Sequence, residues 1–207
     1  MPPKKNKYST AFSAGSLLLK ESEAIVNNIN DAQAFMMGDE DVDYHHIPVN
    51  SEASKKRYRN EITKRLRSTK DALFIDFFQE GSRNDRLLIL FYATCKHYQL
   101  ITDFMLESIL KKWYNLDYDV TADDFKNFLY RQMDKHQELE NLTLNTIKQR
   151  SSTVILMMKE VGVLKDGKLQ KNEYNPVILK RIASNGDGWF LEALLLNETE
   201  RNEITEQ

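Results

Sequence analysis

The stretch VNSEASKKRYRNEITKRLRSTK, residues 49–70, is the most strongly patterned part of this chain of 207 residues. It holds eight basic residues against two acids, a local charge of +6 in a chain whose formal net charge is -2. Asn50 and Ser51 are good N-caps, and Tyr58, Ile62 and Leu66 recur every four residues. We therefore expect a helix with one narrow apolar stripe and, opposite it, a basic face that suits a polyanion.

The chain before this helix carries weaker helix signals. Ser9 or Ser16 is expected to cap a first helix, and Asp31 a short second helix that Gly38 ends. An acidic loop then leads into the basic helix. Helix, short helix, loop and capped basic helix is an order that suits a helix-turn-helix variant, so residues 8–70 are assigned to an N-terminal helix-turn-helix-like region.

The chain after the basic helix predicts a central helical core over residues 71–118. Apolar residues at helical spacing indicate helices over residues 71–80, 84–99 and 102–114. These segments are too apolar for surface helices, so we expect the rest of the chain to pack on them.

The region 119–196 carries a more specific pattern. Thr121 opens one helix, and Thr143 caps another that Gly162 ends. The dipeptide Asp166-Gly167 between two leucines then predicts a two-residue type I′ hairpin. Helix, short helix, capped helix and hairpin is the order at the end of a winged helix-turn-helix, so this region is assigned as winged helix-turn-helix-like.

The expected fold is therefore an all-α, multi-helix protein with winged helix-turn-helix-like elements and a short β-hairpin wing near residues 163–170. Residues 1–7 are expected to form a flexible arm. A last helix is expected within residues 172–185, and residues 197–207 to be a solvated acidic tail.

Two sets of side chains are candidates for contact with nucleic acid. Lysines and arginines of the basic helix and of the hairpin would contact phosphates, while amide side chains on the capped helix would approach base edges. The predicted residues are Lys55, Lys56, Arg57, Arg59, Asn60, Lys64 and Arg67 in the first set, and Asn145, Lys148, Gln149, Arg150, Ser152, Lys165 and Lys168 in the second.

Other classes of function find little support in the sequence. It contains no phosphate-binding loop, nucleophile elbow, zinc-protease or paired-cysteine motif, so we expect no catalysis, cofactor, metal or small-molecule substrate. Cys95 lies in an apolar run and is interpreted as a buried small hydrophobe. The longest apolar run, residues 87–93, is too short to cross a membrane, and no secretory signal is recognised, so a cytoplasmic protein is expected.

Five segments resemble the BrxA family of bacterial BREX (bacteriophage exclusion) systems. They are FSAGSLLLKESEAI, NSEASKKRYRNEITKRL, LITDFMLESIL, TADDFKNFL and TLNTIKQRSSTVILMMKEVGVL, and the likeness extends from about Phe12 to Leu196. The resemblance implies a helical protein with winged helix-turn-helix elements that binds double-stranded DNA and works with other BREX proteins in phage defence.

Two alternatives remain open beside DNA binding. The basic helix and the hairpin region would also suit an adapter that contacts proteins of the same complex. Some family members have been described as antitermination-like RNA binders, and a basic helix does not by itself distinguish duplex DNA from RNA.

Overall fold

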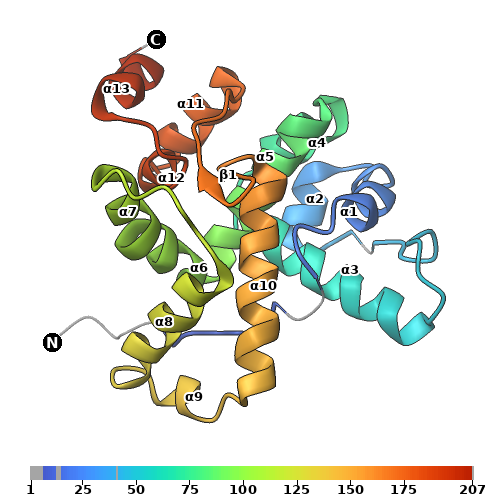
Figure 1. The fold of residues 1–207 in the computed structure, drawn as a ribbon. Coiled ribbons are helices and arrows are strands. Elements are labelled where there is room, and N and C mark those ends of the chain that lie inside the picture. The colour runs from blue at the N-terminus through green and yellow to red at the C-terminus, as the bar shows by residue number, and fades with distance from the viewer. Residues whose placement is uncertain (1–6, 13–14, 41, 207) are drawn as a thin grey trace, which may run out of the picture.

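The computed structural model describes residues 7–12, 15–40 and 42–206. These residues form helices and a two-stranded antiparallel hairpin, which confirms the expected all-α class with a short β-hairpin (Figure 1). Residues 1–6 of the expected arm lie outside the described residues. The elements are α1 Leu19–Val26, α2 Ala32–Met37, α3 Glu52–Arg67, α4 Leu73–Glu80, α5 Arg83–His97, α6 Gln99–Phe104, the π-helical turn η1 Met105–Ile109, α7 Leu110–Tyr114, α8 Ala122–Met133, α9 Gln137–Glu140, α10 Leu144–Val161, β1 Leu164–Lys165, β2 Lys168–Leu169, α11 Pro176–Ser184, α12 Trp189–Ala193 and α13 Glu198–Glu206.

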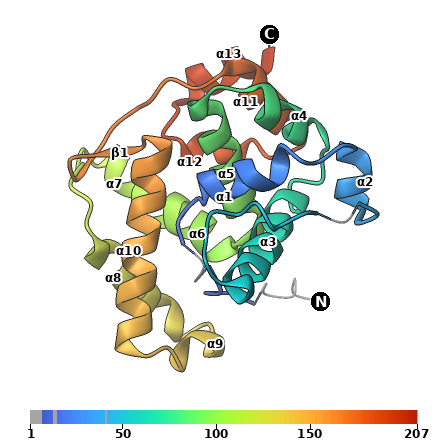
Figure 2. The same cartoon turned by 90° about the vertical axis from the view of Figure 1, so that its right-hand side faces the viewer.

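Helix α5 lies at the centre of the molecule (Figure 2). Ser82 and Asp85 form a reciprocal capping box at its start, and residues 87–95 are all buried. It packs against α3, α4, α6 and α10. The buried apolar side chains form one cluster that draws on the chain from Tyr8 to Leu196, so the predicted regions share a core. The division of the chain into an N-terminal, a central and a C-terminal region stays a prediction.

The capping signals of α2 were predicted correctly from the sequence. The Asp31 carboxylate accepts hydrogen bonds from the first turn of α2, and Gly38 ends that helix at φ 93°.

Cys95 is buried as expected, and its burial raises the pKa of the thiol. Among the described residues, no helix combines the length and apolar character that a membrane crossing requires.

The start of the first helix was predicted wrongly. Helix α1 begins at Leu19, and the described residues before it run across the molecule. The backbone N–H of Tyr8 donates to Glu138 at 2.6 Å, and the Ser16 hydroxyl donates to Glu160 of α10 at 2.8 Å. Ser16 therefore bonds to α10, which is distant in sequence, and does not cap α1.

The hairpin forms as predicted and gains a third strand segment. Asp166 and Gly167 have φ of 51° and 80°, the positive values that a type I′ turn needs. Asp119 forms an isolated antiparallel bridge with Lys168, and the N–H of Val120 donates to the Gly167 carbonyl at 2.8 Å. The hairpin is therefore fixed to the segment that leads into α8.

The C-terminal residues form a helix that was not predicted from the sequence, although most of them are exposed as expected. Residues 198–206 form α13, which packs on α11 (Figure 1). Lys171 lies 2.7 Å from the Glu200 carboxylate, and Arg201 pairs with Glu192. Ion pairs with neighbouring segments, rather than an apolar stripe, hold this acidic helix in place.

Candidate nucleic-acid interface

The outer face of α3 carries four of the residues predicted for it. The apolar stripe, represented by Leu66 at 1% exposure, packs against α5. Lys56, Arg57, Asn60 and Lys64 are exposed on the other side of the helix. The structure thus places three cations and one amide where a polyanion could reach them.

Three other cations predicted on α3 make contacts within the molecule. Lys55 lies 3.0 Å from the acid in the first turn of the helix. The Arg59 guanidinium contacts the neighbouring amide side chain and lies 4.9 Å from the centre of the Tyr44 ring. Arg67 donates from Nε to the Phe35 carbonyl at 2.7 Å. Lys55 is thus paired within α3, Arg59 lies against the loop before α3, and Arg67 lies against α2.

One basic residue of the stretch, Arg65, is buried and serves the core. Its Nε donates to Glu61 at 2.7 Å and its Nη1 to the Ser16 carbonyl at 2.7 Å. The Tyr98 hydroxyl donates to the same Glu61 carboxylate at 2.6 Å. Burial, with this hydrogen bond as a second cause, raises the pKa of Tyr98. Arg65 and Glu61 therefore neutralise each other inside the molecule.

The first half of α10 presents a polar row. The Thr143 hydroxyl accepts a hydrogen bond from the N–H of Thr146 at 3.1 Å, and Gly162 at φ 90° ends the helix as predicted. The predicted residues exposed on this half of the helix are Asn145, Lys148, Gln149 and Ser152.

Arg150 differs from the rest of this set because it is half-buried. Its guanidinium lies 5.6 Å from the centre of the Phe12 ring, and Nε is buried with no hydrogen-bond partner among the described residues. Loss of solvent around the guanidinium lowers its pKa, against a smaller opposing effect of Tyr98. Arg150 thus lies between α10 and the N-terminal segment.

The two hairpin lysines are both exposed. Lys168 lies 2.9 Å from Asp119 on the bridged segment, and this hydrogen bond holds the pKa of the Asp119 carboxyl below its usual range. The carboxylate of Asp119 would compete with a phosphate for Lys168. Lys165, on the opposite strand, is the better candidate for a phosphate contact.

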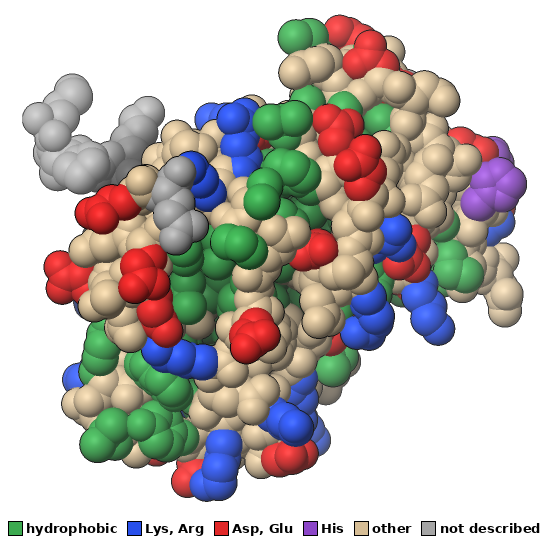
Figure 3. Space-filling model, turned by 90° about the horizontal axis from the view of Figure 1, so that it is seen from above, with side chains coloured by type: hydrophobic (Ala, Val, Ile, Leu, Met, Phe, Trp, Pro, Cys, Tyr) green, Lys and Arg blue, Asp and Glu red, His purple; other side chains and the backbone are tan. Residues whose placement is uncertain are grey.

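The two candidate helices lie on adjoining sides of the molecule. Helix α10 runs down the front of Figure 1 with α3 on its right, and in Figure 2 α3 faces the viewer with α10 at the left. In the view from above, Lys and Arg side chains lie at the right and along the bottom as well as at the upper left, with acids among them (Figure 3). The structure therefore brings the two sets near one another without joining them in one row.

A groove between α8 and α10 was not predicted from the sequence. It encloses about 490 Å³, and its lining includes Tyr130, Leu144 and Lys148. Tyr130 is 41% exposed and Leu144 77% exposed. This groove could not be predicted from the sequence, because a helical pattern does not show which of several apolar positions lacks a neighbour.

Comparison with known proteins identifies the family. A search of curated proteins gave no match. A crystal structure of an uncharacterized protein from Magnetospirillum magneticum is similar in fold, with a TM-score of 0.72 at 18% identity over 91% of this chain and 98% of that one. The model of the BrxA family matches residues 6–186, nearly the whole chain. The chain therefore belongs to the BrxA family, which points to a component of a BREX anti-phage system.

Proposed function

We propose that this chain is a non-catalytic component of a BREX system that binds double-stranded DNA. The observation that carries the proposal is the exposed polar row on the first half of α10. The lysine-bearing hairpin follows the other end of the same helix (Figure 1). Helix α8, short helix α9, helix α10 and the β1–β2 hairpin follow one another in the order of a winged helix-turn-helix. In that interpretation α10 is the recognition helix and the hairpin is the wing.

The side chains have different roles in this proposal. Asn145 and Gln149 carry amide groups, which form paired hydrogen bonds with adenine in the major groove. Lys148 and Lys165 contact phosphates beside the groove. Only the first half of α10 enters the groove, because Val154, Met157 and Met158 in its second half are buried.

The basic face of α3 supplies a second set of phosphate contacts. Lys56 and Lys64 are exposed and lie two helical turns apart on the same helix. Phosphate contacts release counterions, so they make binding depend on salt without reading sequence. This part of the surface would strengthen binding to any duplex.

A second candidate function is that of a protein adapter within the same BREX system. The groove between α8 and α10 favours it, because Tyr130 and Leu144 leave apolar surface exposed beside a polar rim. An adapter would bind other BREX proteins through this groove and would not require the lysines of α3.

Fluorescence anisotropy of a labelled duplex of about 30 base pairs over a salt series tests the proposal, with an RNA hairpin in parallel. Lys56→Ala and Lys64→Ala should each weaken binding about equally on all sequences and lower the salt slope by roughly 0.9. Lys180→Ala, an exposed lysine on α11, is the control and should leave the slope unchanged.

Each outcome separates the candidates. Unchanged slopes in both α3 variants would remove α3 from the contact surface. No duplex binding at low salt, together with co-purification of BREX proteins, would favour the adapter. Stronger binding to the RNA hairpin than to the duplex would favour the RNA alternative.

A further inference from the structure

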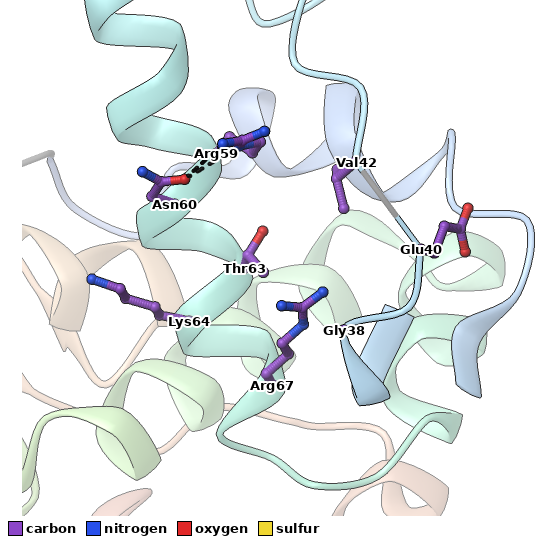
Figure 4. A pocket seen from close by; sticks show the side chains of 8 residues that line it. All are labelled: Gly38, Glu40, Val42, Arg59, Asn60, Thr63, Lys64 and Arg67. Atoms are coloured by element: carbon purple, nitrogen blue, oxygen red, sulfur yellow. Dashed lines mark hydrogen bonds between the residues drawn. The ribbon is translucent and has the colours of Figure 1, made fainter. Parts of the chain in front are cut away.

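A recessed pocket of about 480 Å³ lies between α3 and the segment that follows α2 (Figure 4). Arg59, Thr63 and Arg67 stand one helical turn apart along one side of α3, and Gly38 and Val42 face them from the other wall. Figure 4 shows the two guanidinium groups on the side of α3 that faces this wall, with Thr63 between them. The pocket thus differs from the exposed face that carries Lys56 and Arg57.

The Arg67 guanidinium is held in place before any ligand arrives. Its Nε donates to the Phe35 carbonyl at 2.7 Å, and the guanidinium carbon Cζ lies 5.0 Å from the centre of the Phe35 ring. A Cβ on Gly38 would lie 3.7 Å from Nη1, an ordinary van der Waals contact, so Gly38 adjoins the guanidinium. A fixed guanidinium binds an oxyanion at a smaller entropic cost than a free side chain does.

The Thr63 hydroxyl also points to a ligand. Its hydroxyl oxygen is buried and has no hydrogen-bond partner among the described residues. A buried hydroxyl without a partner is unfavourable, so such a group in a pocket wall indicates a missing acceptor or donor. The hydroxyl stands between the two arginines that line the same wall.

The charge of the pocket selects the ligand. Its described lining includes Arg67, whose guanidinium faces the wall that carries Gly38, and one acid, Glu40. The Glu40 carboxylate is directed away from Thr63 in Figure 4, and it accepts hydrogen bonds from the backbone N–H groups of Asn30 and Asp31 at 2.9 and 3.0 Å. Because Glu40 is engaged there, its carboxylate does not compete with a ligand for Arg67.

We propose that this pocket is a binding site for a phosphoryl group, with Arg67 and the Thr63 hydroxyl as its main contacts. Guanidinium nitrogens match the spacing of phosphate oxygens, and the hydroxyl gains the acceptor that it lacks. The volume lies within the range of small-molecule sites. The phosphoryl group would come from a free nucleotide or from the 5′ end of a nucleic acid. The site does not depend on the proposed contacts of α10 with duplex DNA.

Nuclear magnetic resonance of the full chain tests the site, with the amide of Gly38 as a reporter inside the pocket. Inorganic phosphate and adenosine 5′-monophosphate are titrated at constant ionic strength, so that screening alone moves no signal. We expect saturable shifts of Gly38 that weaken about tenfold in Arg67→Gln and about threefold to tenfold in Thr63→Val. Arg83→Gln removes the same charge from the exposed start of α5, outside the pocket, and should bind within about twofold of the unchanged chain.

Thr63→Val keeps the test sharp if Arg67→Gln fails to fold, because valine has nearly the same shape and no contact of the hydroxyl is lost. Absence of a saturable shift, or equal affinities for Thr63→Val, Arg83→Gln and the unchanged chain, would overturn the proposal. Short duplexes with and without a 5′-phosphate then distinguish the sources. A preference for the phosphorylated duplex that Thr63→Val abolishes assigns the site to nucleic-acid ends, and phosphate binding without that preference assigns it to a free ligand.

Discussion

Replacement of Arg65 by methionine should be among the most damaging substitutions in α3, although the sequence around it looks like a solvated basic face. The Arg65 side chain is 2% exposed and that of Glu61 10% exposed. Methionine would fill most of the space, but it would leave the Glu61 carboxylate with the Tyr98 hydroxyl as its remaining donor among the contacts described above. The Ser16 carbonyl would also lose its bond to Arg65.

The expected cost follows from these contacts. Removal of one member of a buried ion pair costs about 3–5 kcal/mol, because the other charge stays buried without compensation. Arg57→Met, the same change on the exposed face, should cost less than about 0.5 kcal/mol. The double variant Glu61→Leu with Arg65→Met removes both charges and leaves mainly the Tyr98 hydroxyl unpaired, so it should lose only about 1–3 kcal/mol.

Urea-induced unfolding followed by circular dichroism measures the four free energies of unfolding. We expect Arg65→Met to be the least stable and the double variant to recover part of its loss. A double variant as unstable as Arg65→Met would show that uncompensated charge is not the cause. Equal stability of the Arg65 and Arg57 variants would refute the burial argument altogether.

Two further predictions concern stability. Gly162→Ala should lower the free energy of unfolding by about 1 kcal/mol more than Gly186→Ala. Both positions have positive φ, but only at Gly162 would the new Cβ meet the Asn172 side chain, at 2.3 Å, and break the hydrogen bond from Asn172 to the Val161 carbonyl. Equal losses of stability in urea unfolding would refute this crowding. Burial lowers the pKa of His97 below its ordinary 6.5, so the unfolded chain binds the proton more readily, and stability is complete above that pH and falls as pH decreases through it. His97→Gln should flatten the dependence of unfolding free energy between about pH 7 and 5, and an unchanged dependence would contradict this.

Short-range signals in the sequence predicted the parts of the fold that they control. Thr143 and Gly162 mark the ends of α10, and Asp166 with Gly167 gives the hairpin turn. In each case a hydrogen bond or a positive φ within a few residues decides the structure. Such signals keep their meaning whatever the rest of the chain does.

Long-range contacts decided what the sequence did not predict. Ser16 is a good N-cap by type, but its hydroxyl bonds to Glu160 and its carbonyl to Arg65. The acidic segment after Leu196 has no strong apolar stripe, and ion pairs to Lys171 and Glu192 place it as α13. A pattern within one segment contains no information about partners this far away.

The candidate interface shows the same division. Helical spacing alone selected the exposed Lys56, Lys64 and Gln149. It did not show that Arg67 bonds to Phe35 or that Arg150 lies on Phe12. Side chains at the border of a helix face point to solvent or to a neighbour according to what packs there, and that neighbour is unknown until the chain is folded.

The contacts of residues 7–12 and 15–18 have a consequence for synthesis on the ribosome. Their hydrogen bonds to Glu138 and Glu160 span 130 and 144 residues of chain. At about 5–20 residues per second, Ser16 emerges roughly 7–30 s before its partner on α10 is made. During that interval Tyr8 and Phe12, both buried in the finished molecule, have no place to pack. Closure of the core therefore waits for the second half of the chain, and the earliest residues translated are among the last to reach their native positions.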